Sequence, residues 1–197
     1  AAFSGCSQLV SLTGFDSCKI PKINSGLFYG CSGLEEITIP QTVTFIGKSA
    51  FGNCSGLTEL YIPDSVTTIE LAPGGSIATG PFYGCTNIQT ISVGGVSELS
   101  QCMLETKSNI LREITIRGSV KTIGENCFSS YYLKDLDTDG RTVRVVIEPG
   151  VETIGENAFR DCISLTEIAL PSTITTIDPA AFSGCSQLVS LTGFDSC

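Results

Sequence analysis

Three aspartates have the spacing at which carboxylates bind a hard cation. Asp135, Asp137 and Asp139 alternate along the chain. The glycine that follows, Gly140, completes the first half of a calcium-binding loop. The second half does not follow, because position 12 of such a loop is Val146 and not a glutamate. Two interpretations stay open: a calcium site, or a β-hairpin that turns at Asp139-Gly140.

The chain has 10 cysteines, and six of them lie three residues after a phenylalanine that marks a sequence repeat. These are Cys6, Cys31, Cys54, Cys85, Cys162 and Cys185. The regular spacing predicts a column of reduced thiols that point into the interior in parallel. Cys102 and Cys127 lie outside the series, and we expect them just before the phenylalanine position of successive repeats. Adjacent repeats approach within disulfide range, so this pair is a candidate disulfide, whereas Cys18 is expected to be a free thiol.

Asn53 begins the sequence Asn53-Cys54-Ser55, which has the form of an N-glycosylation acceptor. Other repeats have Gly5, Gly30 or Asp161 at the same position. Those residue types are typical of a tight turn. Glycosylation at Asn53 and a purely conformational role are therefore both open.

Enzymatic chemistry has little support in these residues. The sequence contains no histidine, which removes the commonest general base and every Ser-His or Cys-His pair. Gly47-Lys48-Ser49 looks like the end of a phosphate-binding loop, but Thr42 stands where the opening glycine must be. We therefore expect no catalytic residues and no cofactor apart from calcium.

The elements that must position these residues form a series of short repeats. Phenylalanine marks each repeat, and the gap between Phe82 and Phe128 fits a degenerate repeat centred near position 105. The markers are Phe3, Phe28, Phe51, Phe82, Phe128, Phe159 and Phe182. The successive lengths are then 25, 23, 31, 23, 23, 31 and 23 residues. A unit this short cannot bury its own apolar side, so the repeats must stack as a solenoid of about seven turns.

The first 18 residues, 1–18, are identical to residues 180–197. Ordinary repeats agree only at structural positions, and packing does not require identity at Gln8, Thr13 or Asp16. We infer a higher-order unit of 179 residues that begins again at Ala180. Residues 1–197 then form a single solenoid that is an excerpt of a longer array. The alternatives are one duplicated turn at each end, or an artefact of the ends of the polypeptide.

The repeats resemble the BspA-like leucine-rich repeats, whose pattern is L-x-x-I-x-I-P-x-S-V-T-x-I-G-x-x-A-F-x-x-C. The match is close over residues 57–69 and 165–177. This resemblance implies an α/β fold, a leucine-rich-repeat solenoid with a parallel β-sheet on the concave face. It also implies a secreted or surface protein of bacteria or protists, used in adhesion and protein binding, with no shared catalytic residues.

Two repeats are longer than the pattern. Each is lengthened from 23 to 31 residues, by segments 71–80 and 131–143. Insertions in a solenoid protrude from one edge, where they can contact partners or neighbouring chains.

The exposed positions of the predicted sheet carry several glutamates, and Arg144 falls between two of them. We expect the concave face to include Glu36, Thr38, Glu59, Tyr61, Glu113, Thr115 and Glu167. Parallel strands lie about 4.8 Å apart, so neighbouring carboxylates form an acidic stripe. The stripe is either a binding surface for a basic partner or simply a solvated face.

Composition narrows the choice of partner and location. The formal net charge of -9 argues against nucleic acid, whose phosphates require a basic surface. No apolar run is long enough to span a membrane, and the start of the chain lacks a signal segment. By the resemblance, the location is extracellular or at the cell surface.

The sequence thus predicts a non-enzymatic structural protein, a segment of a tandem array that builds an extracellular filament or surface fibre. Its partners are then copies of the same unit, end to end or side by side. The alternative is a surface adhesin that binds a host or matrix protein or a glycan through the concave face and the inserted loops.

Overall fold

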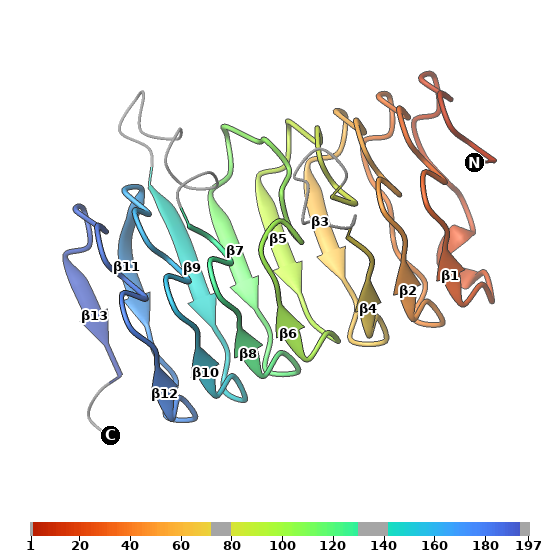
Figure 1. Cartoon of the computed structure of the whole chain (residues 1–197). Helices are drawn as coiled ribbons and strands as arrows, with labels where there is room; N and C mark the ends of the chain where they lie inside the picture. The colour runs from red at the N-terminus through yellow and green to blue at the C-terminus, as the bar shows by residue number, and fades with distance from the viewer. Residues whose placement is uncertain (1, 72–79, 130–141, 194–197) are drawn as a thin grey trace.

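The computed structural model describes residues 2–71, 80–129 and 142–193. The chain winds into a stack of parallel coils, with the N-terminus at one end and the C-terminus at the other (Figure 1). We number the coils by the residue at the phenylalanine position. Coils 1 to 8 contain Phe3, Phe28, Phe51, Phe82, Leu104, Phe128, Phe159 and Phe182 at this position.

One long face of the stack is a six-stranded parallel sheet in the order β13-β11-β9-β7-β5-β3. Its strands are β3 (Glu59–Ile62), β5 (Thr90–Val93), β7 (Glu113–Ile116), β9 (Val143–Ile147), β11 (Leu165–Ala169) and β13 (Ser190–Thr192). Each strand comes from the next coil along the chain. Coils 1 and 2 contribute no strand to this sheet.

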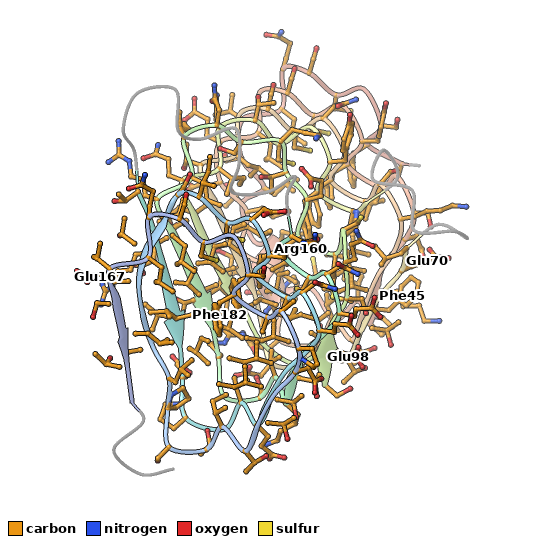
Figure 2. All side chains as sticks on the ribbon, turned by 60° about the vertical axis from the view of Figure 1, so that its left-hand side comes forward. Phe45, Glu70, Glu98, Arg160, Glu167 and Phe182 are labelled. Atoms are coloured by element: carbon orange, nitrogen blue, oxygen red, sulfur yellow. The ribbon has the colours of Figure 1, made fainter. Side chains whose placement is uncertain are left out.

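The opposite face is made of two-residue strands in two shorter sheets. The first sheet has the order β1-β2-β4, with β1 (Lys22–Ile23), β2 (Phe45–Ile46) and β4 (Thr68–Ile69). The second has the order β12-β10-β8-β6, with β6 (Glu98–Leu99), β8 (Thr122–Ile123), β10 (Thr153–Ile154) and β12 (Thr176–Ile177). The break falls between coils 3 and 4, where segment 71–80 enters. Figure 2 shows Glu167 on one side of the coil and Phe45, Glu70 and Glu98 on the other, with Phe182 between them.

Alternation along the strands puts one set of side chains inside the coil. In β3, Leu60 and Ile62 are buried, while Glu59 and Tyr61 are exposed. The same order recurs in β5 and β7. The aliphatic side chains from both faces therefore fill a single continuous core.

The phenylalanine rings form a stacked column through that core. Neighbouring ring centroids lie 5.4 Å apart for Phe28 and Phe51, and 5.1 Å apart for Phe128 and Phe159. The rings are nearly parallel, at 14° and 15°. Offset stacking at this distance is favourable for aromatic rings, so the column ties neighbouring coils together on either side of coil 5, where Leu104 interrupts it.

Positive φ recurs at two corners of the coils. One corner is Gly5, Gly30, Asn53, Gly84, Asp161 and Gly184, and the other is Gly26, Ser49, Cys102, Asn126, Asn157 and Ala180. Glycine, asparagine and aspartate tolerate this conformation best, which explains their recurrence. The phosphate-loop-like Gly47-Lys48-Ser49 belongs to such a corner, as the repeat comparison predicts.

The predicted parallel solenoid is confirmed, with two refinements. In the described residues the only helix is a 3-10 turn, η1 (Phe15–Ser17), so turns occupy the side where helices pack in an α/β repeat. The marker of the degenerate coil is Leu104, one residue before the predicted position. Leu99 pairs with Ile123, and Leu104 and Phe128 each follow five residues later.

Candidate functional site

The outward side chains of the six-stranded sheet form two columns. Register pairs Glu59 with Thr90, Thr90 with Glu113 and Glu113 with Arg144. Arg144 is in turn level with Glu167, because Val145 pairs with Ile168. The second column is Tyr61, Ser92, Thr115, Val146 and Ala169. The structure therefore places these predicted face residues in the order that the repeat alignment expects.

Glu36 and Thr38 extend the columns into coil 2 without a regular strand. Both side chains are exposed in an extended segment, which a hydrogen bond from Glu35 N to Val10 O holds against coil 1 at 3.1 Å. Among the described residues, no lysine or arginine pairs with Glu36 or Glu59. The acidic character of the face is therefore concentrated in coils 2 and 3.

The stripe is partly neutralised farther along. Arg144 Nη1 lies 3.3 Å from Glu113 Oε2, with the Arg144 side chain exposed and that of Glu113 partly exposed. An exposed pair of this kind contributes little to stability. Its effect is on the potential of the face, which becomes less negative over β7 and β9.

A cluster centred on Arg117 was not foreseen from the sequence. Its guanidinium carbon lies 4.4 Å from the centroid of the Tyr61 ring, which is 49% exposed. Its Nη2 also lies 3.1 Å from Asp64 Oδ1 and donates to the carbonyl oxygen of Ile62. Arg117 follows β7 in coil 5, whereas these partners belong to coil 3, so the side chain crosses coil 4.

Gly94 makes this crossing possible. A Cβ atom at Gly94 would collide with Asp64 Oδ1 and with the guanidinium of Arg117. Ser119 completes the arrangement, since its Oγ donates to Asp64 Oδ1 at 2.6 Å and accepts from Gly95 N at 3.0 Å. The Gly94-Gly95 pair next to β5 is the only sequence signal that could have indicated a crossing side chain.

Shallow hollows lie along this face, including one over coils 2 and 3 and one over coils 6 to 8. One, of about 420 Å³, is lined by Glu35, Glu36, Ile37, Thr38, Thr58, Glu59 and Tyr61. The other, of about 290 Å³, lies over β9, β11 and β13 and is lined mainly by Arg144, Val146, Glu167 and Ala169. Both hollows are shallow and are lined by carboxylates, hydroxyls and aliphatic side chains, a surface that can bind a partner.

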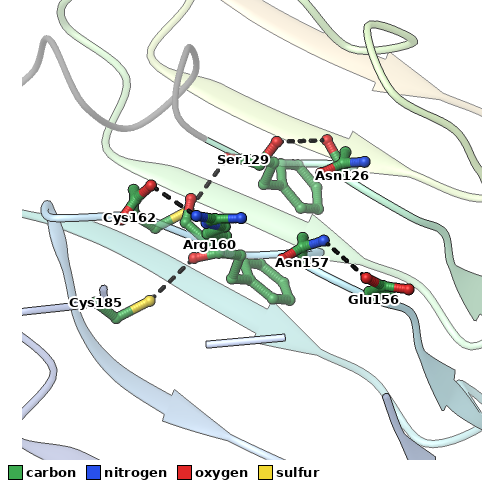
Figure 3. Close-up of polar contacts among 10 residues, drawn as sticks. Asn126, Ser129, Glu156, Asn157, Arg160, Cys162 and Cys185 are labelled. Atoms are coloured by element: carbon green, nitrogen blue, oxygen red, sulfur yellow. Dashed lines mark hydrogen bonds and ion pairs between the residues drawn. The ribbon is translucent and has the colours of Figure 1, made fainter. Parts of the chain in front are cut away.

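The thiol column has a regular geometry that the sequence predicts only in part. Each thiol donates to the phenylalanine carbonyl of the preceding coil: Cys31 to Phe3, Cys54 to Phe28, Cys85 to Phe51, Cys162 to Phe128 and Cys185 to Phe159, at 3.0–3.1 Å. Figure 3 shows the last two of these bonds. Burial raises the pKa of the Cys54 thiol to about 12. Such a thiol stays protonated and unreactive at neutral pH, so Cys54 contributes to packing and not to reactivity.

Cys102 and Cys127 are held as thiols in the structure and not as a disulfide. Because Leu99 pairs with Ile123, Cys102 is the equivalent of Asn126, and Cys127 is the equivalent of Met103. The two cysteines therefore occupy neighbouring and not equivalent positions of successive coils. Cys102 lies at a corner with φ of 67°. Cys127 is buried, and burial raises the pKa of its thiol.

Asn53 has φ of 58°, as expected for a turn residue, and its side chain is exposed. Its Nδ2 donates to Tyr29 Oη at 2.9 Å. Glycosylation of Asn53 stays a prediction. The calcium candidates Asp135, Asp137 and Asp139 lie outside the described residues, as do most of the two inserted segments.

Within the described ranges, no group of three or more acidic or cysteine side chains is arranged to hold a metal ion. A search of the same ranges found no helix with the length and hydropathy needed to cross a bilayer.

Comparison with known proteins gives a consistent result. The family model described as "BspA type Leucine rich repeat region (6 copies)" matches residues 1–72, 74–146 and 141–196. Among curated proteins, none matches the chain. A leucine-rich repeat protein from Eubacterium ventriosum ATCC 27560 is similar in structure, with a TM-score of 0.59 and 26% identity over 80% of this chain. The leucine-rich repeat protein TpLRR of T. pallidum has a TM-score of 0.50 and 22% identity over 88% of this chain. The matches cover 38% and 63% of those two proteins.

Proposed function

The chain belongs to the BspA-type leucine-rich repeat family, and on that premise we propose that it is a non-enzymatic structural segment of a tandem array that builds an extracellular filament or surface fibre. The observation that carries this proposal is the identity of residues 1–18 and 180–197. Coils 1 and 8 share this sequence, so the coil that ends one 179-residue unit would also be the first coil of the next unit.

Coils 1 and 8 have the same local geometry. Gly5 and Gly184 both have φ of 78°. Ser7 N donates to Gly5 O at 2.7 Å, and Ser186 N donates to Gly184 O at 2.8 Å. A shared sequence that forms the same corner can be continued in the same way, so the contact between coils 1 and 2 describes how coil 8 would meet a following unit.

Native material gives the direct test. Seven coil spacings of about 4.8 Å give a rise of roughly 34 Å per 179-residue unit. Negative-stain microscopy of material from the source organism should show filaments with an axial repeat near this value, or a multiple of it if the units supercoil. Monodisperse compact particles would contradict the proposal.

A second function is favoured by the Tyr61–Arg117 cluster. Tyrosine and arginine are the residue types that most often dominate binding energy at interfaces, and here they fix each other on an exposed face. As an adhesin, the chain would bind a protein or glycan over coils 2 and 3. Soluble protein should then bind its ligand saturably, and Tyr61→Ala should weaken that binding at least tenfold, while Val146→Ala on the same face should leave it unchanged.

The two functions share a location and differ in partners. Under both, the protein lies outside the cell or at its surface. A fibre requires other copies of the same unit, whereas an adhesin requires a host or matrix partner and tolerates a single unit. The full-length sequence separates them: many near-identical units favour the fibre, and a few diverged units with an anchor favour adhesion.

A further inference from the structure

The six-stranded sheet ends at β3, although coils 1 and 2 lie beyond it. In coil 2 the equivalent segment, residues 35–38, is extended but forms no strand. Successive residues of a strand face its two neighbours alternately, and Ile62 faces coil 4, because Gly94 N donates to Ile62 O at 3.2 Å. The backbone groups of Glu59 and Tyr61 therefore face coil 2. In the described part of the chain, no backbone hydrogen bond joins them to residues 35–38. We call this gap, between residues 35–38 and β3, the open seam.

The open seam does not result from its position near an end of the stack. Coils 2 and 3 each have a coil on both sides. Ser190–Thr192 form β13 and pair with β11 of coil 7, whereas the identical residues Ser11–Thr13 form no strand next to coil 2. The same sequence is thus paired against coil 7 and unpaired against coil 2, so the missing ladder is a property of coil 2.

Electrostatic repulsion accounts for the missing ladder. Glu36 is level with Glu59 in the repeat alignment, and among the described residues of this column no other neighbouring pair has like charges. Where Glu113 is level with Arg144, in contrast, the ladder is closed. Like charges directly opposite each other on neighbouring strands are destabilising. The two glutamates therefore oppose closure of the seam.

The hollow of about 420 Å³ lies over the open seam. It presents several hydrogen-bond acceptors, namely the carboxylates of Glu36 and Glu59 and the backbone carbonyl oxygens of Glu59 and Tyr61. The Tyr61 ring, about half exposed, also lines it. None of the described residues that line the hollow is a lysine or an arginine. Such a site is complementary to a cation that donates several hydrogen bonds.

We propose that the open seam binds an arginine side chain of a partner protein. Placed between Glu36 and Glu59, a guanidinium would remove their mutual repulsion and donate to the unpaired carbonyl oxygens of β3. Its planar fork of five donors can reach acceptors on both coils at once, whereas a lysine ammonium is a compact point charge. The proposal rests on the adhesin function and names the class of partner, which is a protein with an exposed arginine and not a glycan.

An NMR titration of the full chain with an acetylated Gly-Arg-Gly peptide amide tests the proposal. The amide shifts should saturate, and the largest should fall in residues 35–38 and 58–62. The same peptide with citrulline in place of arginine keeps the shape of the side chain and lacks its charge. It should bind about tenfold more weakly, because the charged hydrogen bonds are lost. Equal binding of the two peptides would overturn the proposal.

Two variants of equal net charge locate the site. The double variant Glu36→Gln, Glu59→Gln should weaken binding of the arginine peptide about tenfold, by the loss of both ionic contacts. The control, Glu113→Gln with Glu167→Gln, removes two charges from the same column and should leave binding unchanged. An equal loss in both double variants would mean that the peptide responds only to the overall charge of the face, and the site would be rejected.

Hydrogen exchange tests the open seam without a ligand. The Tyr61 amide of the unchanged protein should exchange faster than the Ser92 amide, which is its equivalent in the paired strand β5. Neutralising Glu36 and Glu59 together should slow exchange at Tyr61, because the repulsion that opposes closure is removed. Exchange at Tyr61 as slow as at Ser92 in the unchanged protein would show a closed seam and reject the proposal.

The arginine site and the adhesin function can fail separately. Saturable binding of a host or matrix ligand that depends on Tyr61, without binding of the arginine peptide, would reject the arginine site alone. Binding of the peptide at the open seam, without saturable binding of any host or matrix protein, would support the site and reject the adhesin function.

Discussion

Coil 7 keeps the whole repeat signature, whereas coil 5 has lost its phenylalanine and its cysteine. In coil 7, Phe159 lies between two stacked rings and Cys162 bonds to the carbonyl of Phe128. In coil 5, Leu104 replaces the phenylalanine, and Ser108 lies six residues before Ile114, at the cysteine position. Coil 5 nevertheless pairs in register with both of its neighbours, whereas the pairing of coil 7 with coil 6 has a β-bulge between Leu165 and Ile168. The backbone ladder therefore sets the register, and the side-chain columns add stability that one coil can lack.

Coil 5 compensates with polar contacts. Three of the four buried polar or charged residues in the described part of the chain are Glu105, Thr106 and Ser108. Ser108 Oγ donates to the carbonyl of Ile88 in coil 4, much as the thiols do elsewhere. Arg117, from the same coil, reaches back to coil 3. A coil without the ring and thiol is thus connected by hydrogen bonds and by an ion pair.

The largest effect should come from the ring column. Phe159→Ala should lower the free energy of unfolding by about 3–5 kcal/mol, since it leaves a cavity between two rings. Phe3→Ala, at a half-exposed end ring, should cost about 1 kcal/mol or less. Chemical denaturation of both variants measures the difference. Equal losses would mean that the column does not bind the coils together.

The guanidinium of Arg117 connects coil 5, which lacks the ring and the thiol, to coil 3. Replacing Arg117 removes this connection. Arg117→Ala should lower stability by about 1–3 kcal/mol, because a charged hydrogen bond and a cation–π contact are lost together. Lys121→Ala is a matched control, as its ion pair with Glu152 is exposed. Denaturation should show little change for the control. A loss no greater than that of the control would show that the crossing side chain is not structural.

The cysteine position of the repeat holds Ser108 in coil 5 and Cys54 in coil 3, and each residue can be replaced by alanine. Ser108→Ala should cost about 1–3 kcal/mol, the penalty for a buried acceptor that loses its donor. Cys54→Ala should cost about 0.5–1.5 kcal/mol, as for one deleted methylene.

In the native protein, a thiol reagent should modify exposed Cys6 and Cys18 but not Cys54. Rapid modification of Cys54 would contradict the buried column. A full count of reactive thiols after unfolding tests the candidate disulfide, because Cys102 and Cys127 react only if no disulfide joins them.

The smallest effect concerns a carboxylate that, like Arg117, spans two coils. Glu70 Oε2 accepts from Lys48 N at 3.1 Å and from Ser25 Oγ at 2.9 Å. These bonds lower the pKa of Glu70 below its ordinary value of 4.5. The charged form is therefore favoured by folding, and its contribution is present above about pH 4.5 and lost as the pH falls through the lowered pKa.

Glu70→Gln should therefore be slightly less stable than the unchanged protein at pH 7 and equally stable near pH 3. Urea unfolding at the two pH values provides the measurement. A difference that persists undiminished at pH 3 would assign the effect to side-chain shape and not to charge.

The sequence predicts the stack well because its markers recur with the period of one coil. Aligned residues such as Glu59 and Glu113 fall in one column, since parallel pairing preserves the repeat spacing. The prediction is one residue out in coil 5, where no phenylalanine marks the turn: the marker is Leu104, which makes Cys102 the equivalent of Asn126. Contacts such as Arg117 to Tyr61 were not predictable, because they join coils that are not adjacent and have no counterpart in other repeats.

The coil-by-coil arrangement has a mechanical consequence. Since each coil contacts mainly its two neighbours, tension applied along the axis should peel the stack from an end in separate steps and not in a single rupture. A released coil of 23 residues adds roughly 76–83 Å of extended chain. Under load, such a rod would lengthen gradually and dissipate work at every step.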